Sequence, residues 1–585
     1  MTKLDDWDSI WEGGVVDDDE AKASSSTPAP LPSQVLSHEF GRPHFRCLGV
    51  DGTSYYYQAA EVSQIISLSG AAHKVENLLR LAPLQWWEME FPGRGGFDIK
   101  AAINGMISTC IRVGKYSPDR VTGRGVYVEK DGTVIAHLGD RLLINGDRRE
   151  IFEASTSRRI FEERDAIELG KLAPLATPEA KRIDDLIQRV SFTEKDMARV
   201  FVGWLVIAPM CGALNWRAHL WLTGPFESGK SYLVREVAGR LLGELAVTVR
   251  GATTEAGIRQ ELQSDALPVL FDEAEAKDQN AERRLADILE LVRASSSAGG
   301  AKILKGSAGG RNQMFRIRSS FLFAAIDAAI KQSADDSRII RLTLRGPSLE
   351  ATDEERRALE TQRARFNRDL ETLLADHYGE RLFLRSLGLL PTIIRNTATF
   401  AMAIAEQTGS KRLGDLLGGP LAGWLSLHSE RALTDDEARS YISKSAWLGE
   451  TLIRSKTARD HTLAFSHLMQ STLRLDGGAE RTVAELIDLV ISGQDMGGEK
   501  HMVLKRHGLK VETPEEPGGG YGLFIGRNTN GVRKLFFGSQ WASDPCGALS
   551  QHPAASAPSH PVRFAGTVKV RAVRIDLEKA GQEDA

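Results

Sequence analysis

The chain has 585 residues, of which 42% are hydrophobic and 26% are charged. This length predicts several domains with globular cores, and the net charge of −4 excludes a uniformly basic nucleic-acid binder. The longest apolar run, Val200–Leu214, is too short to span a membrane and contains Pro209. An acidic start predicts no signal peptide, and four cysteines without C-x-x-C spacing predict a reducing, cytoplasmic location without a zinc site.

Residues 1–35 are predicted to form a disordered acidic tail, because eight acids and two lysines precede a Ser- and Pro-rich stretch. Without this net charge of −6 the rest of the chain carries −4 + 6 = +2, which is compatible with local contacts to DNA. Trp7, Ile10 and Trp11 recur at helical spacing, so a docking motif and a solvated tail are both open interpretations.

Residues 36–178 predict a mixed α+β domain, since Asp51-Gly52, Asp131-Gly132 and Asn145-Gly146 separate extended runs as in β-hairpins. The fold class that we expect is multidomain α/β. Its further parts are a helical bundle over 179–216, a parallel α/β domain over 217–346, a helical domain over 347–475, and a small α+β unit over 476–585 in which "GLFIG" and "VRKLFFG" are strands.

A strand, a loop and a helix are predicted across His219–Gly243, and the loop reads Gly224-Pro-Phe-Glu-Ser228-Gly229-Lys230-Ser231. Glycines in this pattern let backbone N–H groups turn toward phosphates. We expect Gly224, Ser228 and Gly229 to line a nucleotide site. Lys230 would reach the β- and γ-phosphates, and Ser231 would hold Mg²⁺.

An apolar strand that ends in Asp272-Glu273 follows this loop. Asp272 is the candidate Mg²⁺ ligand through water, and Glu273 is the candidate base for the attacking water. The next apolar strand predicts Asp327 as a sensor of the γ-phosphate, with a plain loop residue or a capping acid as the alternative.

Arginines lie next to the last strand, in "SADDSRIIRLTLRG". Arg338 is the candidate arginine finger that reaches a neighbouring subunit's γ-phosphate, and Arg341 is the other possibility. The alternative is a surface arginine paired with Asp335 or Asp336.

Together with "GALNWRAHLWLTGPFESGKS", "TTEAGIRQEL", "LPVLFDEAE" and "FRIRSSFLF", these motifs resemble the superfamily 3 helicases. This AAA+-related group comprises viral, phage and plasmid replication ATPases, and the ATPase halves of phage and mobile-element primase–helicases look closest. The resemblance covers residues 200–346 firmly. It implies a P-loop AAA+-like sheet, a C-terminal winged-helix-like unit, ATP and Mg²⁺ as cofactors, and a ring, expected to be a hexamer. Asp327 departs from the usual asparagine, and no primase site is visible, so a separate primase is an expected partner.

A β-hairpin is predicted within Gly299–Ser320, which the resembling helicases project into a central channel to grip DNA. Lys302, Lys305 and Arg311 would contact phosphates there, unless the segment is an ordinary surface loop. Lys500, Lys505 and Arg506 lie on the second helix of a possible helix-turn-helix.

The expected function is an ATP-dependent helicase or translocase acting on single-stranded or forked DNA in phage or mobile-element replication. The alternatives are an AAA+ ATPase that remodels a protein or defence complex, and an origin-binding scaffold that uses ATP only to assemble.

Overall fold

The computed structural model divides the chain into two compact units, Met1–Ile167 and Glu168–Ala585. The acidic tail lies outside the described residues, and the finer domain limits remain predictions. The described residues are 43–155, 159–194, 196–274, 278–297, 303–306, 312–315, 317–326, 335, 337–346, 352–445, 460–495, 497–512, 520–539, 541–542, 544–566 and 568–583.

The first unit combines small antiparallel sheets with helices, as predicted. The hairpin of β1 (Phe45–Asp51) and β2 (Ser54–Ala59) turns at Asp51-Gly52, and β3 pairs with β2. Aromatic and aliphatic side chains between this sheet and the helices form a core around the fully buried Trp87. The remaining helices and strands are β3 (Ile65–Ser69), α1 (Val75–Leu78), α2 (Leu84–Glu90), β4 (Pro92–Gly93), β5 (Gly96–Phe97), α3 (Ile99–Val113), β6 (Val121–Thr122), β7 (Gly125–Val128), β8 (Val134–His137), β9 (Leu142–Ile144), β10 (Asp147–Arg149), α4 (Ile151–Ala154) and β11 (Ile160–Phe161).

A five-stranded sheet forms the centre of the second unit, in the order β13-β14-β17-β12-β18. Every pairing in it is parallel, so all five strands end at the same edge, where α/β proteins bind ligands. The three middle strands are buried along their whole length, as expected for a parallel sheet covered on both faces. The strands are β12 (His219–Thr223), β13 (Val247–Arg250), β14 (Val269–Asp272), β17 (Phe321–Ala324) and β18 (Ile339–Thr343).

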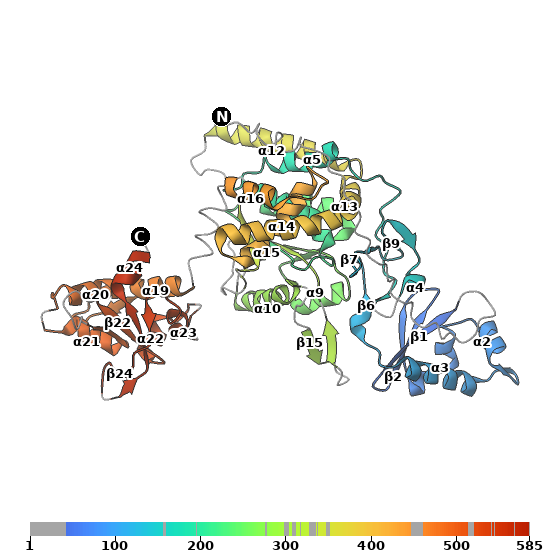
Figure 1. Ribbon diagram of the computed structural model, residues 1–585, viewed down its shortest axis with the longest axis horizontal. Helices are drawn as coiled ribbons and strands as arrows, with labels where there is room; N and C mark the ends of the chain where they lie inside the picture. The colour runs from blue at the N-terminus through green and yellow to red at the C-terminus, as the bar shows by residue number, and fades with distance from the viewer. Residues whose placement is uncertain are drawn as a thin grey trace. The chain divides into compact units, whose positions relative to one another are not determined.

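Helices that precede the sheet strands in the sequence and helices that follow them pack together into one layer (Figure 1). Helices α6 and α15 touch through their backbones, because a Cβ atom on Gly203 would lie 1.8 Å from the Pro420 carbonyl oxygen. A Cβ atom on Gly423 would likewise lie 2.3 Å from the Gly203 carbonyl oxygen. The helices are α5 (Thr177–Ile187), α6 (Asp196–Ile207), α13 (Tyr378–Gly388), α14 (Leu390–Thr408), α15 (Lys411–Ser426) and α16 (Asp435–Lys444).

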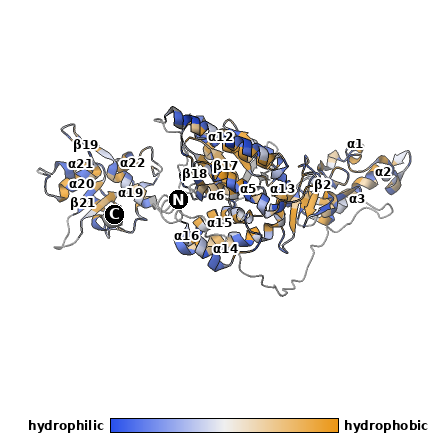
Figure 2. Cartoon of the chain, turned by 90° about the horizontal axis from the view of Figure 1, so that it is seen from above, coloured by the Kyte–Doolittle hydropathy of each residue, from blue (hydrophilic) through white to orange (hydrophobic). Residues whose placement is uncertain are grey.

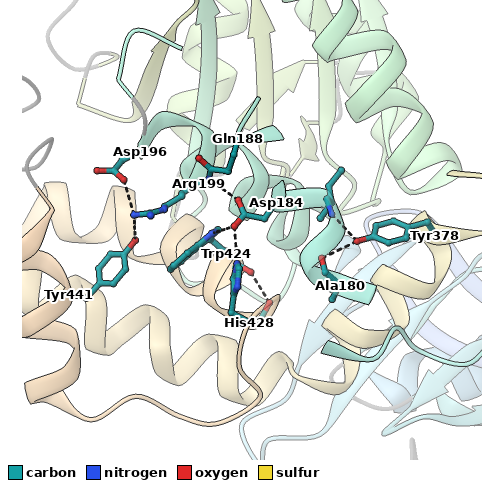
Figure 3. A network of polar contacts seen from close by, with 12 residues as sticks. Ala180, Asp184, Gln188, Asp196, Arg199, Tyr378, Trp424, His428 and Tyr441 are labelled. Carbon is teal, nitrogen blue, oxygen red and sulfur yellow. Dashed lines mark hydrogen bonds and ion pairs between the residues drawn. The ribbon is translucent and has the colours of Figure 1, made fainter. Parts of the chain in front are cut away.

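A buried carboxylate joins α5 to α15 within this helical layer (Figure 3). Asp184 accepts hydrogen bonds from Trp424 Nε1 at 2.8 Å, from His428 Nε2 at 2.9 Å and from Gln188 Nε2 at 2.9 Å. Burial by itself raises the pKa of Asp184, but the donors from His428, Gln188 and Trp424 outweigh it and leave the pKa below its usual value. The network therefore holds an ionised aspartate between the two segments.

The C-terminal part of the second unit, residues 460–583, has its own core. Its four-stranded antiparallel sheet has the order β21-β22-β26-β23. The winged-helix description remains a prediction. The elements are α19 (Asp460–Gln470), β19 (Thr472–Arg474), β20 (Glu480–Thr482), α20 (Val483–Ile491), α21 (Glu499–Arg506), β21 (Leu509–Glu512), β22 (Gly522–Gly526), α22 (Asn530–Leu535), α23 (Pro545–Leu549), β23 (Ala555–Ser556), β24 (Val562–Arg563), β25 (Lys569–Val570), β26 (Ala572–Asp576) and α24 (Leu577–Glu583).

The prediction of a strand over "VRKLFFG" is wrong, because this segment begins inside helix α22. The Thr529 side chain caps the helix by accepting a hydrogen bond from the Val532 N–H. Val532 and Phe536 are both buried, at the helical spacing of four residues.

Among the described residues, no single helix has the length and apolar composition to cross a membrane. The bent pair α13 and α14 passes that test only when its two helices are taken together.

Candidate functional site

The predicted phosphate loop leaves the carboxyl end of β12 in the expected shape. Gly224 has φ +146°, and a Cβ atom there would lie 2.7 Å from the Leu344 carbonyl oxygen. Gly229 has φ +94° and occupies the position before the helix that starts at Lys230. Both backbone conformations favour glycine, so the two glycines of the motif are needed for this loop.

The Lys230 ammonium lies within this loop. Its Nζ donates to the carbonyl oxygens of Gly224 at 2.7 Å and Pro225 at 2.8 Å, and to Ser228 Oγ at 3.3 Å. The helix after it consists of α7 (Lys230–Tyr232), a π-helical stretch (Leu233–Gly239) and α8 (Arg240–Leu242). An ammonium group within a loop of this shape fits the binding of a phosphate group.

The two predicted metal ligands are in direct contact. Ser231 Oγ donates to Asp272 Oδ1 at 3.1 Å, although β17 separates β12 from β14 in the sheet. The Asp272 residue is 1% exposed at the last position of β14. A hydroxyl beside a carboxylate offers the oxygen ligands that Mg²⁺ prefers, so these residues fit the metal.

Glu273 directly follows this carboxylate and projects from the edge of the sheet. Its side chain is 58% exposed, and its backbone has φ +60°, which is uncommon for a residue other than glycine. The Glu273 N–H donates to Asp272 Oδ1 at 3.0 Å. Gly251 lies so close that a Cβ atom on it would be 2.7 Å from the Glu273 carbonyl oxygen. Unusual backbone geometry at a functional position is common where the fold must aim one side chain.

Arg235 also belongs to this site, although no sequence motif predicted it. Its Nε contacts Asp272 Oδ2, and its Nη2 donates to Glu273 Oε1 at 3.2 Å. Arg235 follows Ser231 by four residues in a helix, which places both on one face. That spacing is the signal that could have identified it.

The helix α12 (Asp353–Leu374) reaches the phosphate loop from a distant part of the chain. Arg363 Nη2 donates to the Glu227 carbonyl oxygen at 2.9 Å, and Phe366 contacts Tyr232 edge to face with ring centroids 6.0 Å apart. Figure 2 shows α12 as a largely hydrophilic helix. No sequence pattern pointed to Arg363, because its position depends on packing between segments far apart in the sequence.

The predicted sensor Asp327 lies outside the described residues. The preceding residue, Ile326, accepts a hydrogen bond through its carbonyl oxygen from the Gly224 N–H at 3.3 Å. The carboxyl end of β17 therefore lies against the phosphate loop, and the role of Asp327 remains a prediction.

Arg338 lies at the opposite edge of the sheet from this loop. It precedes β18, whose first residue, Ile339, pairs with His219 at the start of β12. The five residues of β12 span roughly 17 Å, so Arg338 belongs to another surface than this chain's own phosphate loop. Arg341, the other candidate, lies opposite Trp221 in the middle of the strand pair.

Positive charges gather around Arg338. Burial lowers its pKa, and the nearby Arg412 lowers it further, while Asp335 acts in the other direction. Arg412 Nη1 donates to Ser337 Oγ at 2.8 Å, and Arg293 Nε lies 3.3 Å from Asp335 Oδ1. No sequence motif predicted Arg293 or Arg412, which come from two helices distant from Arg338 in the sequence.

The β-hairpin predicted between the strand that ends at Asp272 (β14) and the next apolar strand (β17) is confirmed. Strands β15 (Ile303–Gly306) and β16 (Asn312–Phe315) pair antiparallel, with Lys305 opposite Gln313. Lys302 and Arg311 lie outside the described residues, as does the side chain of Lys305, so their contacts with DNA remain predictions.

No protein-family model and no curated protein matches this chain. The structure is similar to the solved structure of the SCCmec type IV Cch helicase, with 11% identity over 93% of this chain and 95% of that one and a TM-score of 0.43. It is also similar to the C-terminal region of NrS-1, with 10% identity, coverage of 91% and 96%, and a TM-score of 0.34. The JCV helicase is similar over 42% of this chain and 62% of its own, with 17% identity and a TM-score of 0.23. Likeness at these TM-scores does not decide the chemistry, which depends on the residues of the site.

Proposed function

We propose that the protein is a ring-forming ATP hydrolase that moves DNA, as a helicase or translocase does. The observation that carries this proposal is the meeting of Lys230, Ser231, Asp272 and Glu273 at the carboxyl edge of one parallel sheet. They follow or end two strands, β12 and β14, that are not neighbours in the sheet, and together they would supply a phosphate cation, metal ligands and a base.

Each of these side chains has a separate task. Lys230 would bind the β- and γ-phosphates, while Ser231 and Asp272 would hold Mg²⁺, which when bound neutralises phosphate charge. Glu273 is exposed at the edge of the sheet, where it can accept the proton of an attacking water. Its hydrogen bond from Arg235 holds the carboxylate beside the metal ligands.

The hairpin is the part that we propose moves DNA. The chain runs from β14 through α10 (Gln279–Ser295) to the hairpin and returns as β17, which pairs with β14. Arg217 fixes the end of α10, since its N–H donates to the Ser296 carbonyl oxygen at 2.7 Å and its Nη1 to that of Ser295 at 3.0 Å. Figure 1 shows the hairpin, labelled β15, next to α9 (Glu255–Leu262) and α10. Both of its ends are thus tied to the sheet that carries Asp272.

A ring supplies the remaining group. Arg338 lies across the sheet from its own phosphate loop, a position that suits a finger for the site of the next subunit. In that arrangement ATP is hydrolysed between subunits, and a basic hairpin from each subunit faces a central channel.

ATPase rates with and without single-stranded DNA, together with unwinding of a forked duplex, test the proposal. We expect strong stimulation by DNA. The triple variant Lys302→Ala, Lys305→Ala, Arg311→Ala should keep the basal rate and lose both stimulation and unwinding. Unwinding at the wild-type rate by this variant would contradict the role of the hairpin. Stimulation by a protein substrate alone would support a remodelling ATPase, and ATP binding without turnover would support a scaffold.

A further inference from the structure

A cluster of basic residues lies in the C-terminal part of the chain, far from the phosphate loop in sequence. Residues 517–575 contain seven lysines and arginines and one acid, Asp544, in a protein whose net charge is −4. Asp544 caps α23 by accepting a hydrogen bond from the Gly547 N–H at 2.9 Å. Arg574 is engaged with Glu512 at 2.9 Å. The other six are exposed, and we call them the basic rim: Arg527, Arg533, Lys534, Arg563, Lys569 and Arg571.

Two members of the basic rim meet at one end of the sheet. The Arg527 N–H donates to the Arg571 carbonyl oxygen at 2.8 Å, directly beyond the paired ends of β22 and β26. Helix α22 begins three residues after Arg527 and carries Arg533 and Lys534. The loop, the start of β26 and the helix therefore present four cations close together.

The hairpin of β24 and β25 adds the last two. Arg563 and Lys569 are directly paired in its register. Its Phe564 packs with Phe524 of β22 and Ala572 of β26, and a Cβ atom on Gly526 would be 3.0 Å from the Phe564 ring. The hairpin, labelled β24 in Figure 1, is thus held against the sheet end that carries Arg527.

These charges are not neutralised within the described part of the chain, where none of the six forms an ion pair with a carboxylate. The helix that the sequence suggested for DNA differs, because two of its three cations are paired. On α21, Lys500 Nζ lies 3.9 Å from Asp495 Oδ1, and Arg506 Nη1 lies 2.8 Å from Asp476 Oδ1. Six neighbouring cations without a carboxylate partner repel one another, and a polyanion relieves that repulsion.

An aromatic side chain next to the basic rim indicates which polyanion fits. Phe537 follows α22 and is 88% exposed, the most exposed large hydrophobic side chain of the described residues. Cations for a phosphate backbone, combined with an exposed ring for a base, are the features that bind unpaired nucleic-acid strands. We propose that the basic rim and Phe537 form a binding site for single-stranded nucleic acid, separate from the ATP site and the channel hairpin.

This proposal goes beyond the proposed function, because it requires neither ATP nor a ring. The test measures binding of a fluorescent oligothymidylate and of a blunt duplex to the full chain without nucleotide. The hairpin variant Lys302→Ala, Lys305→Ala, Arg311→Ala serves as the background, so that only contacts elsewhere contribute. Failure of the hairpin proposal and failure of this one are therefore distinguishable.

In that background, the rim variant carries three substitutions, Arg527→Ala, Arg533→Ala and Lys534→Ala. It should bind the single strand at least about tenfold more weakly. The slope of log affinity against log salt concentration should fall by about 2, because each lost phosphate contact removes about 0.7. The matched control is Arg474→Ala, Arg481→Ala, Arg506→Ala, which removes the same charge from exposed positions of the same part of the chain. The control should bind within about twofold of its parent, since these arginines lie outside the basic rim. Unchanged melting temperatures confirm that both variants fold.

Phe537→Ala should weaken binding of the single strand by about fivefold or more without changing the salt slope, because it removes stacking and no charge. Its affinity for the duplex should not change. Equal losses for rim and control variants would overturn the basic rim as a site. Loss of duplex binding alone, with no effect of Phe537→Ala, would overturn the single-strand assignment. Two results together would show that the acidic tail occupies the basic rim: deletion of residues 1–35 tightens binding of the single strand, and the rim variant of the full chain binds it as tightly as its parent. The assignment of the basic rim to nucleic acid would then fail.

Discussion

Arg235 contacts the Asp272 carboxylate through Nε and reaches Glu273 Oε1 at 3.2 Å through Nη2. One guanidinium therefore lies against both acidic groups of the candidate site. Asp272 is 1% exposed, and burying a carboxylate costs free energy unless a cation or hydrogen bonds offset the lost hydration. Arg235 supplies positive charge at the same carboxylate that we expect to hold Mg²⁺.

We therefore expect Arg235→Ala to lower the melting temperature measured in EDTA, because the buried carboxylate loses its nearby cation. Mg²⁺ with a non-hydrolysable ATP analogue should recover most of the loss, since the metal supplies the missing charge. Differential scanning fluorimetry in both conditions measures this. Arg240→Ala on the same helix is the control, because its partner Glu371 is exposed and a surface pair contributes little. An equal loss in both conditions would show that Arg235 acts on packing alone.

Glu273→Gln should keep nucleotide binding and lose turnover. The amide retains an oxygen that can accept the hydrogen bond from Arg235, but it cannot take a proton from water. Lys230→Ala should lose binding itself, because the phosphate loop loses its ammonium. Binding of a fluorescent ATP analogue and release of phosphate separate the two effects. Hydrolysis by Glu273→Gln at the wild-type rate would exclude Glu273 as the base.

The parts of the site that the sequence predicted are those that contiguous residues determine. Gly224 and Gly229 set the loop locally, and the apolar strand that ends at Asp272 places the acid at the sheet edge. Arg363 was missed because its place depends on how α12 packs, which no local pattern specifies. The prediction of a strand over "VRKLFFG" was wrong for a local reason. The apolar residues there fit both the helical and the strand period, and the Thr529 cap is the feature that indicates a helix.

The contact between α6 and α15 gives a prediction about stability. Gly203→Ala would place a Cβ atom 1.8 Å from the Pro420 carbonyl oxygen, so the two helices must separate. We expect a loss of several kcal/mol in the free energy of unfolding, comparable to other strongly overpacked cores. Gly388→Ala in α13 is the control, because a Cβ atom there meets nothing within 4 Å. That substitution should change stability by less than about 1 kcal/mol. Urea denaturation compares the two, and similar losses would contradict the close helix contact.

His219 predicts how stability depends on pH. The Phe321 N–H donates to His219 Nδ1 at 3.1 Å, so the proton is on Nε2, which donates to Ser296 Oγ at 3.1 Å. Burial, with Arg217 and Arg338 nearby, lowers the pKa of His219 to about 3. The unfolded chain binds a proton below about pH 6.5, while the folded protein does not. The contribution of the neutral, buried His219 to the free energy of unfolding is therefore complete above about pH 6.5. It is lost as the pH falls toward 3, at up to about 1.4 kcal/mol per pH unit.

Urea denaturation of His219→Gln between pH 7.5 and pH 4.5 tests this. The variant should be less stable at neutral pH and should show a shallower decline on acidification than the wild type. His377→Gln is the control, because that side chain is 65% exposed. The same pH dependence in His219→Gln and in the wild type would contradict a neutral, buried His219.

The position of Arg338 predicts how subunits cooperate. Arg338 lies at the edge of the sheet opposite the phosphate loop, so Arg338→Ala should bind ATP normally and hydrolyse it slowly. Its removal should not unfold the protein, because repulsion from Arg412 and Arg293 opposes its attraction to Asp335. Arg341→Ala, in the middle of β18, distinguishes the two candidates, and only the finger should show this behaviour.

Mixing two inactive variants tests whether the arginine acts on a neighbour. Arg338→Ala retains an intact phosphate loop, while Lys230→Ala retains an intact Arg338. In a mixed ring, some interfaces combine the intact loop of one subunit with the intact arginine of the next, so ATP hydrolysis should return in part. The recovered rate should peak near equal proportions, because such interfaces are then most frequent. Mixed oligomers are verified by pull-down of a tagged variant. If they form and no hydrolysis returns at any ratio, Arg338 does not serve a neighbouring site, and the ring arrangement that we propose loses its main support.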